Sequence, residues 1–231
     1  MQPQFQMSTG SASQERSVQQ NRVLRNTYLL LALSMIPTAI GALVGIKMGF
    51  SFFAGSPMVS FLLFLGIAFG FMWGIEKTKH SSMGVALLLG FTFFMGLMLS
   101  RILSFALGFS NGGSLIFMAA AGTAGAFFAM SFLATVIKTD LSYLGKFLFI
   151  GVIVLLVASL ANIFFQIPAL ALTISAVAVM LFSAYLLYDI KRIIDGGEDN
   201  YITATLAVYL DIYNIFVNLL NLLMAFAGER D

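Results

Sequence analysis

The chain has 231 residues, of which 60% are hydrophobic and only 10% are charged, and its formal net charge is +2. Because a soluble domain carries about 25% charged residues, this composition indicates a polytopic helical membrane protein, and the small net charge gives no support for nucleic-acid binding. The chain has no cysteine and a single histidine, His80. Disulfides, cysteine-ligated metals and a site built from several histidines of one chain are therefore excluded.

Residues 1–20 are polar, rich in Gln, Ser and Thr, and contain no apolar run. This composition is typical of a disordered segment. The apolar run after Arg22 and Arg25 is too long for a signal peptide and lacks a convincing small-residue cleavage site. The sequence therefore predicts a disordered tail over residues 1–20 and a transmembrane domain over residues 21–231.

Seven apolar segments follow the tail, each about long enough to cross a bilayer, which needs roughly 20 residues. They lie at 27–46, 57–75, 83–107, 113–137, 144–165, 168–188 and 204–227. The predicted fold is an all-α membrane protein, a bundle of seven transmembrane helices whose short connections make consecutive helices antiparallel neighbours. Pro57 and Pro168 stand at segment starts, where the missing N–H of proline costs nothing.

The basic residues between the segments predict an orientation. If the tail is cytoplasmic, nine lysines and arginines fall on the same side and two on the other. The nine are Arg16, Arg22, Arg25, Lys77, Lys79, Lys138, Lys146, Lys191 and Arg192; the two are Lys47 and Arg230. The positive-inside rule then places the N-terminus in the cytoplasm and, after seven crossings, the C-terminus outside.

The last apolar stretch, Tyr201 to Ala227, carries a polar stripe. Asp211, Asn214, Asn218 and Asn221 follow one another at offsets of 3, 7 and 10 from the aspartate. At roughly 100° per residue, all four lie within about 80° of each other on the helix. Lipid cannot satisfy a carboxyl and three amides, so the stripe is expected to face protein or a water-filled cavity. For the asparagines, hydrogen bonds between helices are the leading interpretation.

Asp189 and Asp211 lie on sequential antiparallel segments in the same half of the membrane, so we expect the two carboxyls to approach each other. Asp211 is about seven residues, or roughly 10 Å, inside the seventh segment, where a carboxyl costs at least ~2.5 kcal/mol on insertion scales. Two carboxyls in a low-dielectric site cannot both ionise cheaply, so one is expected to hold or share a proton. Alternatively, Asp189 ends its helix and pairs with Lys191 or Arg192.

Enzymatic functions find little support in the sequence. It contains no nucleophile–base constellation, phosphate-binding glycine loop or metal-ligand spacing, so we expect no enzyme, no metal site and no tightly bound cofactor. Gly196 and Gly197 precede Glu198 and Asp199, but without the ligand spacing of an EF-hand they predict a turn. Arg101, roughly 27 Å into the third segment, is interpreted as a snorkelling anchor at the opposite face.

Several stretches resemble the Bax inhibitor-1 family of membrane proteins. They are Tyr185-Leu-Leu-Tyr-Asp189, Tyr209-Leu-Asp-Ile-Tyr-Asn-Ile-Phe-Val-Asn-Leu-Leu220 and Lys138-Thr-Asp-Leu-Ser-Tyr-Leu144. Two further stretches, Val23-Leu-Arg-Asn-Thr-Tyr28 and Gly196-Gly-Glu-Asp-Asn-Tyr201, are similar to the bacterial YccA-like branch. The resemblance covers roughly residues 20 to 231, and the combination is specific although each stretch alone is modest.

This resemblance implies a bundle whose seventh helix is enclosed by the other six, in the bacterial inner membrane. It also implies, as in some members, a pH-sensitive calcium leak gated by an aspartate pair, and Asp189 and Asp211 fall on those two positions. Calcium would then be a transported ion. Some channel-like members place an arginine at the inner end of the second helix to latch the aspartates; here Lys77 or Lys79 would be the basic partner, as a point charge rather than a bidentate fork.

The YccA-like branch implies a different function, that of a substrate and modulator of the FtsH membrane protease, engaged through the N-terminal tail. Two hypotheses therefore stand: a cation leak controlled by protonation of Asp189 and Asp211, and a non-conducting protein that modulates the protease. The aspartate pair and the polar stripe favour the first hypothesis, and the tail favours the second.

Overall fold

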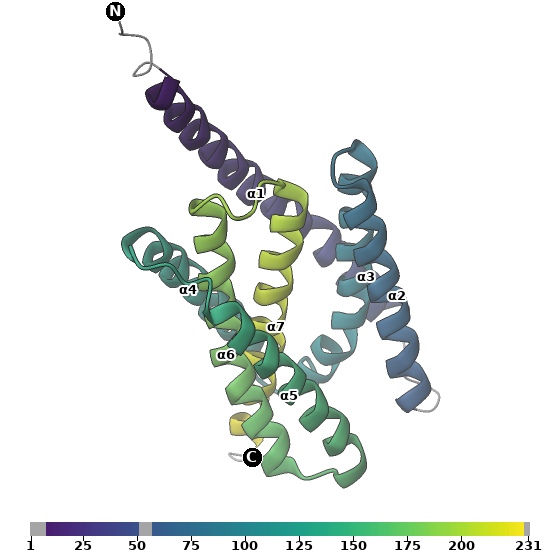
Figure 1. The fold of residues 1–231 in the computed structure, drawn as a ribbon. Helices are drawn as coiled ribbons and strands as arrows, with labels where there is room; N and C mark the ends of the chain where they lie inside the picture. Colours follow the sequence, from purple (N-terminus) through teal and green to yellow (C-terminus); the bar gives the residue numbers. More distant parts are fainter. Residues whose placement is uncertain (1–7, 51–56, 229–231) are drawn as a thin grey trace, which may run out of the picture.

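The computed structural model describes residues 8–50 and 57–228, and within this part of the chain the regular structure is entirely helical. The helices are α1 (Ser8–Lys47), α2 (Pro57–Thr78), α3 (Ser82–Ala106), α4 (Gly112–Val136), α5 (Leu144–Phe165), α6 (Pro168–Ile194) and α7 (Tyr201–Gly228). In the described ranges these seven helices are all long and apolar enough to cross a membrane. The predicted all-α architecture with seven spans is confirmed, and α1 begins at the end of the bundle opposite to the end of α7 (Figure 1).

The first helix is longer than the sequence predicted. The polar residues from Ser8 to Gln20, expected to belong to a disordered tail, continue α1 as helix, and residues 1–7 of that expected tail lie outside the described residues. Adding a residue to an existing helix gains a hydrogen bond without a new nucleation cost, and Gln, Glu, Arg and Ala are good helix formers. Figure 1 shows this part of α1 extending beyond the rest of the bundle.

The sixth helix also runs further than expected, to Ile194 rather than to residue 188. Ile190 and Ile193 are almost fully buried, so the apolar face of α6 continues through its charged last turns. Lys191 and Arg192 lie in the last turn, where cations interact favourably with the carboxyl end of the helix dipole. As a result, Asp189 lies within α6 rather than at its end.

The packing order does not follow the order of the chain. The most extensive contact of α1 is with α3 rather than with α2, and α4 packs against α6 and α7. Glycines explain the first pairing: a Cβ on Gly41 of α1 would meet the backbone carbonyl of Phe93, and one on Gly96 of α3 would meet that of Thr38. Small residues let helix backbones approach this closely inside a membrane. The expectation that consecutive helices are neighbours holds for α2 and α3, α5 and α6, and α6 and α7, but among the described residues α1 makes no extensive contact with α2, nor α4 with α5.

The seventh helix is largely, but not completely, surrounded. It packs against α1, α2, α3, α4 and α6, whereas α5 packs along α6. Most of the α5 surface is exposed, and Leu148 is its buried residue. The enclosure of α7 by all six other helices is therefore not confirmed, because α5 lies on the outside of the bundle.

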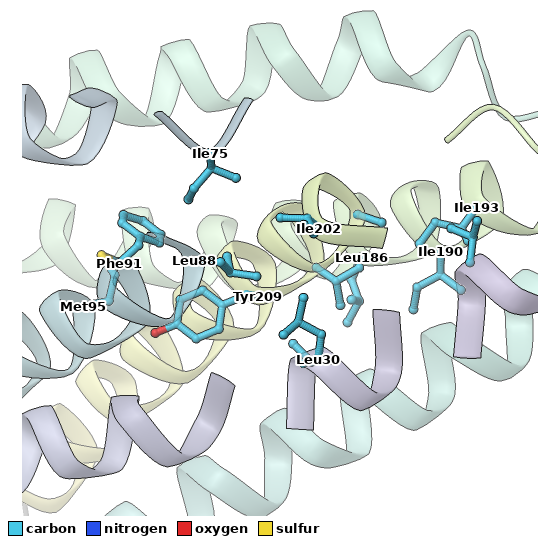
Figure 2. Packing of buried hydrophobic residues seen from close by; sticks show 14 of the residues in the cluster. Leu30, Ile75, Leu88, Phe91, Met95, Leu186, Ile190, Ile193, Ile202 and Tyr209 are labelled. Atoms are coloured by element: carbon cyan, nitrogen blue, oxygen red, sulfur yellow. The ribbon is translucent and has the colours of Figure 1, made fainter. Parts of the chain in front are cut away.

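The main apolar core surrounds the first half of α7. Leu30, Ile75, Leu88, Leu186, Ile202 and Tyr209, from five different helices, pack together with at most 6% exposure (Figure 2). A smaller cluster near the other end of the bundle contains Ala106, Leu115, Ala119, Leu220 and Met224. The polar residues of α7 therefore lie on a helix that is packed into an apolar cluster along its first half and into a second apolar cluster near its other end.

Candidate functional site

The structure brings the two predicted carboxyls together. Asp189 of α6 and Asp211 of α7 interact directly through their side chains. Asp211 is only 4% exposed, and among the described residues no group forms a hydrogen bond with its Oδ2 atom. Tyr185, one turn before Asp189, lies close enough to interact electrostatically with both carboxyls. The result is an acidic pair in which Asp211 is buried and Asp189 is half-buried.

The turn between α6 and α7 determines how these two carboxyls meet. The N–H of Gly196 donates to the carbonyl of Ile193 and that of Gly197 donates to the carbonyl of Arg192. This is a Schellman ending, and Gly196 provides the left-handed residue that it needs, with a φ of +79°. The prediction of a turn at Gly196–Gly197 is therefore confirmed.

Asn200 then starts α7. Its Oδ1 accepts the backbone N–H of Ile202 at 2.9 Å and that of Thr203 at 3.3 Å, which makes it the N-cap. Its Nδ2 donates to the carbonyl of Lys79 at 2.7 Å, so the cap also binds the α2–α3 turn. With the Schellman ending before it, this cap sets the register in which α7 runs back along α6.

The basic residues near the pair have other partners. Lys191 donates to Oδ1 of Asp195 at 2.6 Å, and Arg192 lies 3.5 Å from Oε2 of Glu198. The interpretation of Asp189 as the ion-pair partner of Lys191 or Arg192 is therefore not supported, although the charge of Arg192 is near enough to act on Asp189.

The two lysines proposed as basic partners also have contacts of their own on α2 and the turn after it. Lys79 is hydrogen-bonded to Glu76, which raises the pKa of this half-buried lysine, and the ammonium of Lys77 lies 3.9 Å from the ring centre of Trp73. Arg101 is exposed near the far end of α3.

The asparagines of the stripe are half-buried and do not join helices in the expected way. Nδ2 of Asn214 donates to the carbonyl of Leu210, and Nδ2 of Asn218 donates to that of Asn214, each at 2.8 Å. These are bonds one turn back along α7 itself, so the expectation of hydrogen bonds between helices was wrong for these two amide groups. Asn221 is likewise half-buried. The stripe continues from Asp211 along one face of α7, and the amide groups of Asn214 and Asn218 bond within that helix, whereas Asp211 contacts α6.

A second polar face of α7, which the sequence analysis missed, makes the links between helices. It consists of Thr205, Tyr209 and Tyr213, whose spacing of four residues places them on one side of the helix. The hydroxyls of Tyr209 and Tyr213 reach the hydroxyl of Thr38 (2.9 Å) on α1 and the carbonyl of Met95 (3.3 Å) on α3. The single hydroxyl hydrogen of Thr205 is donated to the carbonyl of Tyr201 at 2.6 Å, within α7, and the carbonyl of Thr27 lies 3.3 Å away. The spacing of four residues is the signal in the sequence that indicates this face.

Comparison with known proteins agrees with this architecture. A family model described as "Inhibitor of apoptosis-promoting Bax1" matches residues 20–228. A protein of Neisseria meningitidis serogroup A is 43% identical over 215 residues, covering 92% of this chain and 95% of the relative.

Two relatives from Escherichia coli, both 39% identical over 92% of this chain and 95% of their own length, are named "Modulator of FtsH protease YccA" (strain K12) and "Inner membrane protein YccA" (O6:H1). The family match spans all seven helices, and the relatives are matched over nearly their full length. The chain therefore belongs to the Bax inhibitor-1 family of membrane proteins and is similar to its bacterial member YccA.

Proposed function

We propose that this protein is a non-enzymatic cation leak of the bacterial inner membrane, in which Asp189 and Asp211 control the passage of cations such as calcium and make it depend on pH. The observation that supports this proposal most directly is the buried carboxyl of Asp211, whose Oδ2 atom has no hydrogen-bond partner among the described residues. A membrane segment keeps such a group at a substantial free-energy cost, and ionisable residues at this depth typically serve ion or proton pathways.

The chemistry of two adjacent carboxyls suits a proton-sensitive site. When both are ionised they repel each other, and a cation between them compensates that repulsion; carboxylate oxygens are ligands that calcium accepts. When one carboxyl is protonated, the pair can share a hydrogen bond, and both the repulsion and the attraction for cations fall. Protonation therefore has two opposing effects on flux. It weakens the attraction that draws cations in, and it relieves the repulsion that affects the packing of α6 against α7.

Calcium flux into liposomes that contain the purified protein tests this proposal. We expect flux above that of protein-free liposomes, and we expect Asp211→Asn to change it, because Asn keeps the size and hydrogen bonding of Asp while removing its charge. Asp140→Asn is a matched control, since Asp140 is an exposed carboxyl in the α4–α5 connection, where hydrogen bonds from Ser142 hold its pKa below its usual range. Flux indistinguishable from protein-free liposomes would contradict the proposal.

The second candidate function is modulation of the FtsH protease. It is favoured by the 39% identity to the relative named as a modulator of that protease, which extends over 92% of this chain. In this case the N-terminal part of the chain would face the cytoplasm and engage the protease. Co-purification of the protein with FtsH from membranes, and the rate of degradation of FtsH substrates with and without the protein, test this function independently of ion flux.

A further inference from the structure

A small cavity lies beside the acidic pair, at the end of the bundle formed by the α6–α7 turn. Its volume is about 10 Å³, close to the space of one water molecule. It is lined by Asp189, Arg192 and Ile193 of α6, by Glu198 of the turn, and by Ala204 and Ala207 of α7. The lining therefore joins the half-buried Asp189 to Arg192 and Glu198 at the α6–α7 turn.

The α7 residues of the lining are two alanines, and Asp211 lies beyond them on the same helix. Ala204, Ala207 and Asp211 are spaced by three and four residues, so they follow one face of the helix. The two alanines have the smallest side chains that this face could carry without glycine, and the space above them is what larger residues would fill. A path for water along this face would connect the turn to both aspartates.

Two residues of the cavity lining, Arg192 and Glu198, form an ion pair. Nη2 of Arg192 lies 3.5 Å from Oε2 of Glu198, and Nε of Arg192 donates to the carbonyl of Gly197. Glu198 is held in place through its other oxygen: Oε1 accepts the N–H of Asn200 at 3.2 Å and the hydroxyl of Thr203 at 3.0 Å. One oxygen of Glu198 thus stabilises the start of α7, and the other is directed to Arg192.

The two side chains of this ion pair differ in solvent exposure. The side chain of Glu198 is 19% exposed, whereas that of Arg192 is 48% exposed. An arginine of this exposure gains little stability from a partly solvated ion pair, so it can leave the contact and return readily. Glu198, with two further hydrogen bonds to the α7 start, would stay.

We propose that the Arg192–Glu198 contact closes a water-filled entrance to the acidic pair, and that Glu198 is the first carboxylate met by a cation that enters from the α6–α7 turn. The identity of the entering ion rests on the proposed function, whereas the entrance itself does not. In this arrangement Arg192 leaves the contact, water reaches the alanine face, and Glu198, Asp189 and Asp211 form a series of carboxylates leading into the bundle.

The absence of cysteine from the chain allows a direct test of water access. Ala207→Cys places a single thiol in the lining of the cavity, and a membrane-impermeant thiol reagent reports its access from either side of sealed vesicles. We expect the thiol to react from the side of the α6–α7 turn, and Arg192→Gln to accelerate the reaction about two- to fivefold, as expected for loss of a partly exposed ion pair.

Three controls make this test specific. Val208→Cys, a neighbouring fully buried position, should stay unreactive with and without Arg192→Gln. Asp199→Asn changes the charge next to Glu198 at an exposed residue outside the cavity lining and should leave the rate at position 207 unchanged. Glu198→Gln retains an acceptor for Asn200 and Thr203 but weakens the contact with Arg192, and it should accelerate the reaction as Arg192→Gln does.

Two results would contradict the proposal of an entrance at this contact. One is an equal rate at position 207 with and without Arg192→Gln; the other is equal acceleration at positions 207 and 208, which would mean general loosening of the helices. Because the readout is thiol chemistry, its failure is distinct from failure of the cation-leak proposal. Flux that depends on Asp211 together with unchanged labelling would place the ion entrance elsewhere.

Discussion

Tyr209 on α7 and Thr38 on α1, which are 171 residues apart in the chain, place their hydroxyl oxygens 2.9 Å apart in the buried centre of the bundle. The single hydroxyl hydrogen of Thr38 is donated to the carbonyl of Ser34 at 2.8 Å. Tyr209 is therefore the donor to Thr38. This bond connects the helix that carries Asp211 to the helix that begins the chain, on the side of α7 away from the acidic pair.

Replacing this tyrosine tests whether the bond holds α7 in place. Tyr209→Phe removes the donor and leaves Thr38 bonded to Ser34, so we expect the free energy of unfolding to fall by about 0.5–1.5 kcal/mol, near the lower value if the average for membrane helices applies. Unfolding by SDS in mixed micelles measures it. Tyr213→Phe, whose hydroxyl lies 3.3 Å from the carbonyl of Met95, should cost less. A larger effect of Tyr213→Phe than of Tyr209→Phe would contradict this account.

The α6–α7 turn gives a second prediction. Gly196 has a φ of +79°, and a Cβ there would meet the side chain of Gln20. Gly196→Ala should therefore lower the free energy of unfolding by about 1–2 kcal/mol, the cost of a left-handed conformation in a residue with a Cβ. Gly197→Ala is the matched control, because positive φ values of glycine in the described ranges occur at Gly49 and Gly196 only. Thermal unfolding in detergent should separate the two variants, and equal melting temperatures would argue against the role of Gly196.

The parts of the fold that depend on local patterns could be predicted from the sequence. The spans follow from apolar runs, Pro57 and Pro168 begin their helices as expected, and Asp189 meets Asp211 because a short turn makes α6 and α7 antiparallel neighbours. The pairing of α1 with α3 could not be predicted in this way, because it depends on where Gly41 and Gly96 let two backbones approach.

The candidate site was predicted less completely than the fold. The meeting of the two carboxyls could be predicted, but hydrogen bonds between helices were expected from the asparagines, whereas Tyr209 and Tyr213 make them. A side chain in a helix can bond one turn back or across to a neighbour, and only the positions of the surrounding helices decide between the two. The same reason applies to Arg192. It pairs with Glu198 rather than with Asp189, and this pairing depends on the geometry of the α6–α7 turn.

The orientation in the membrane is a third prediction. Nine lysines and arginines against two favour a cytoplasmic N-terminus and an external C-terminus. An alkaline phosphatase reporter fused after Asp231 should therefore be active in the bacterial periplasm, and a cytoplasmic fluorescent reporter at the same position should not become fluorescent after Sec export. The opposite pattern would reverse the assignment of the α6–α7 turn to the cytoplasmic side.

The N-terminal segment provides the fourth prediction, which belongs to the protease-modulator function. Deleting residues 2–17 leaves the apolar span Val18–Lys47 intact, so insertion should be unaffected. If FtsH engages this segment, the half-life of the truncated protein should lengthen in cells that contain the protease and should match the full-length half-life in cells that lack it. Equal half-lives in protease-containing cells would exclude the segment as the point of engagement.

The central claim is that Asp189 and Asp211 make cation flux depend on pH, and the pH dependence of calcium flux through Asp211→Asn in liposomes tests it most directly. Wild type, Asp211→Asn and Asp189→Asn are measured over the same series from mildly acidic to neutral pH, with equal protein per liposome. The account predicts that wild-type flux changes across this range, that Asp211→Asn flattens the response because it removes the titrating group, and that Asp189→Asn alters it. Three superimposable pH–flux curves would contradict the claim.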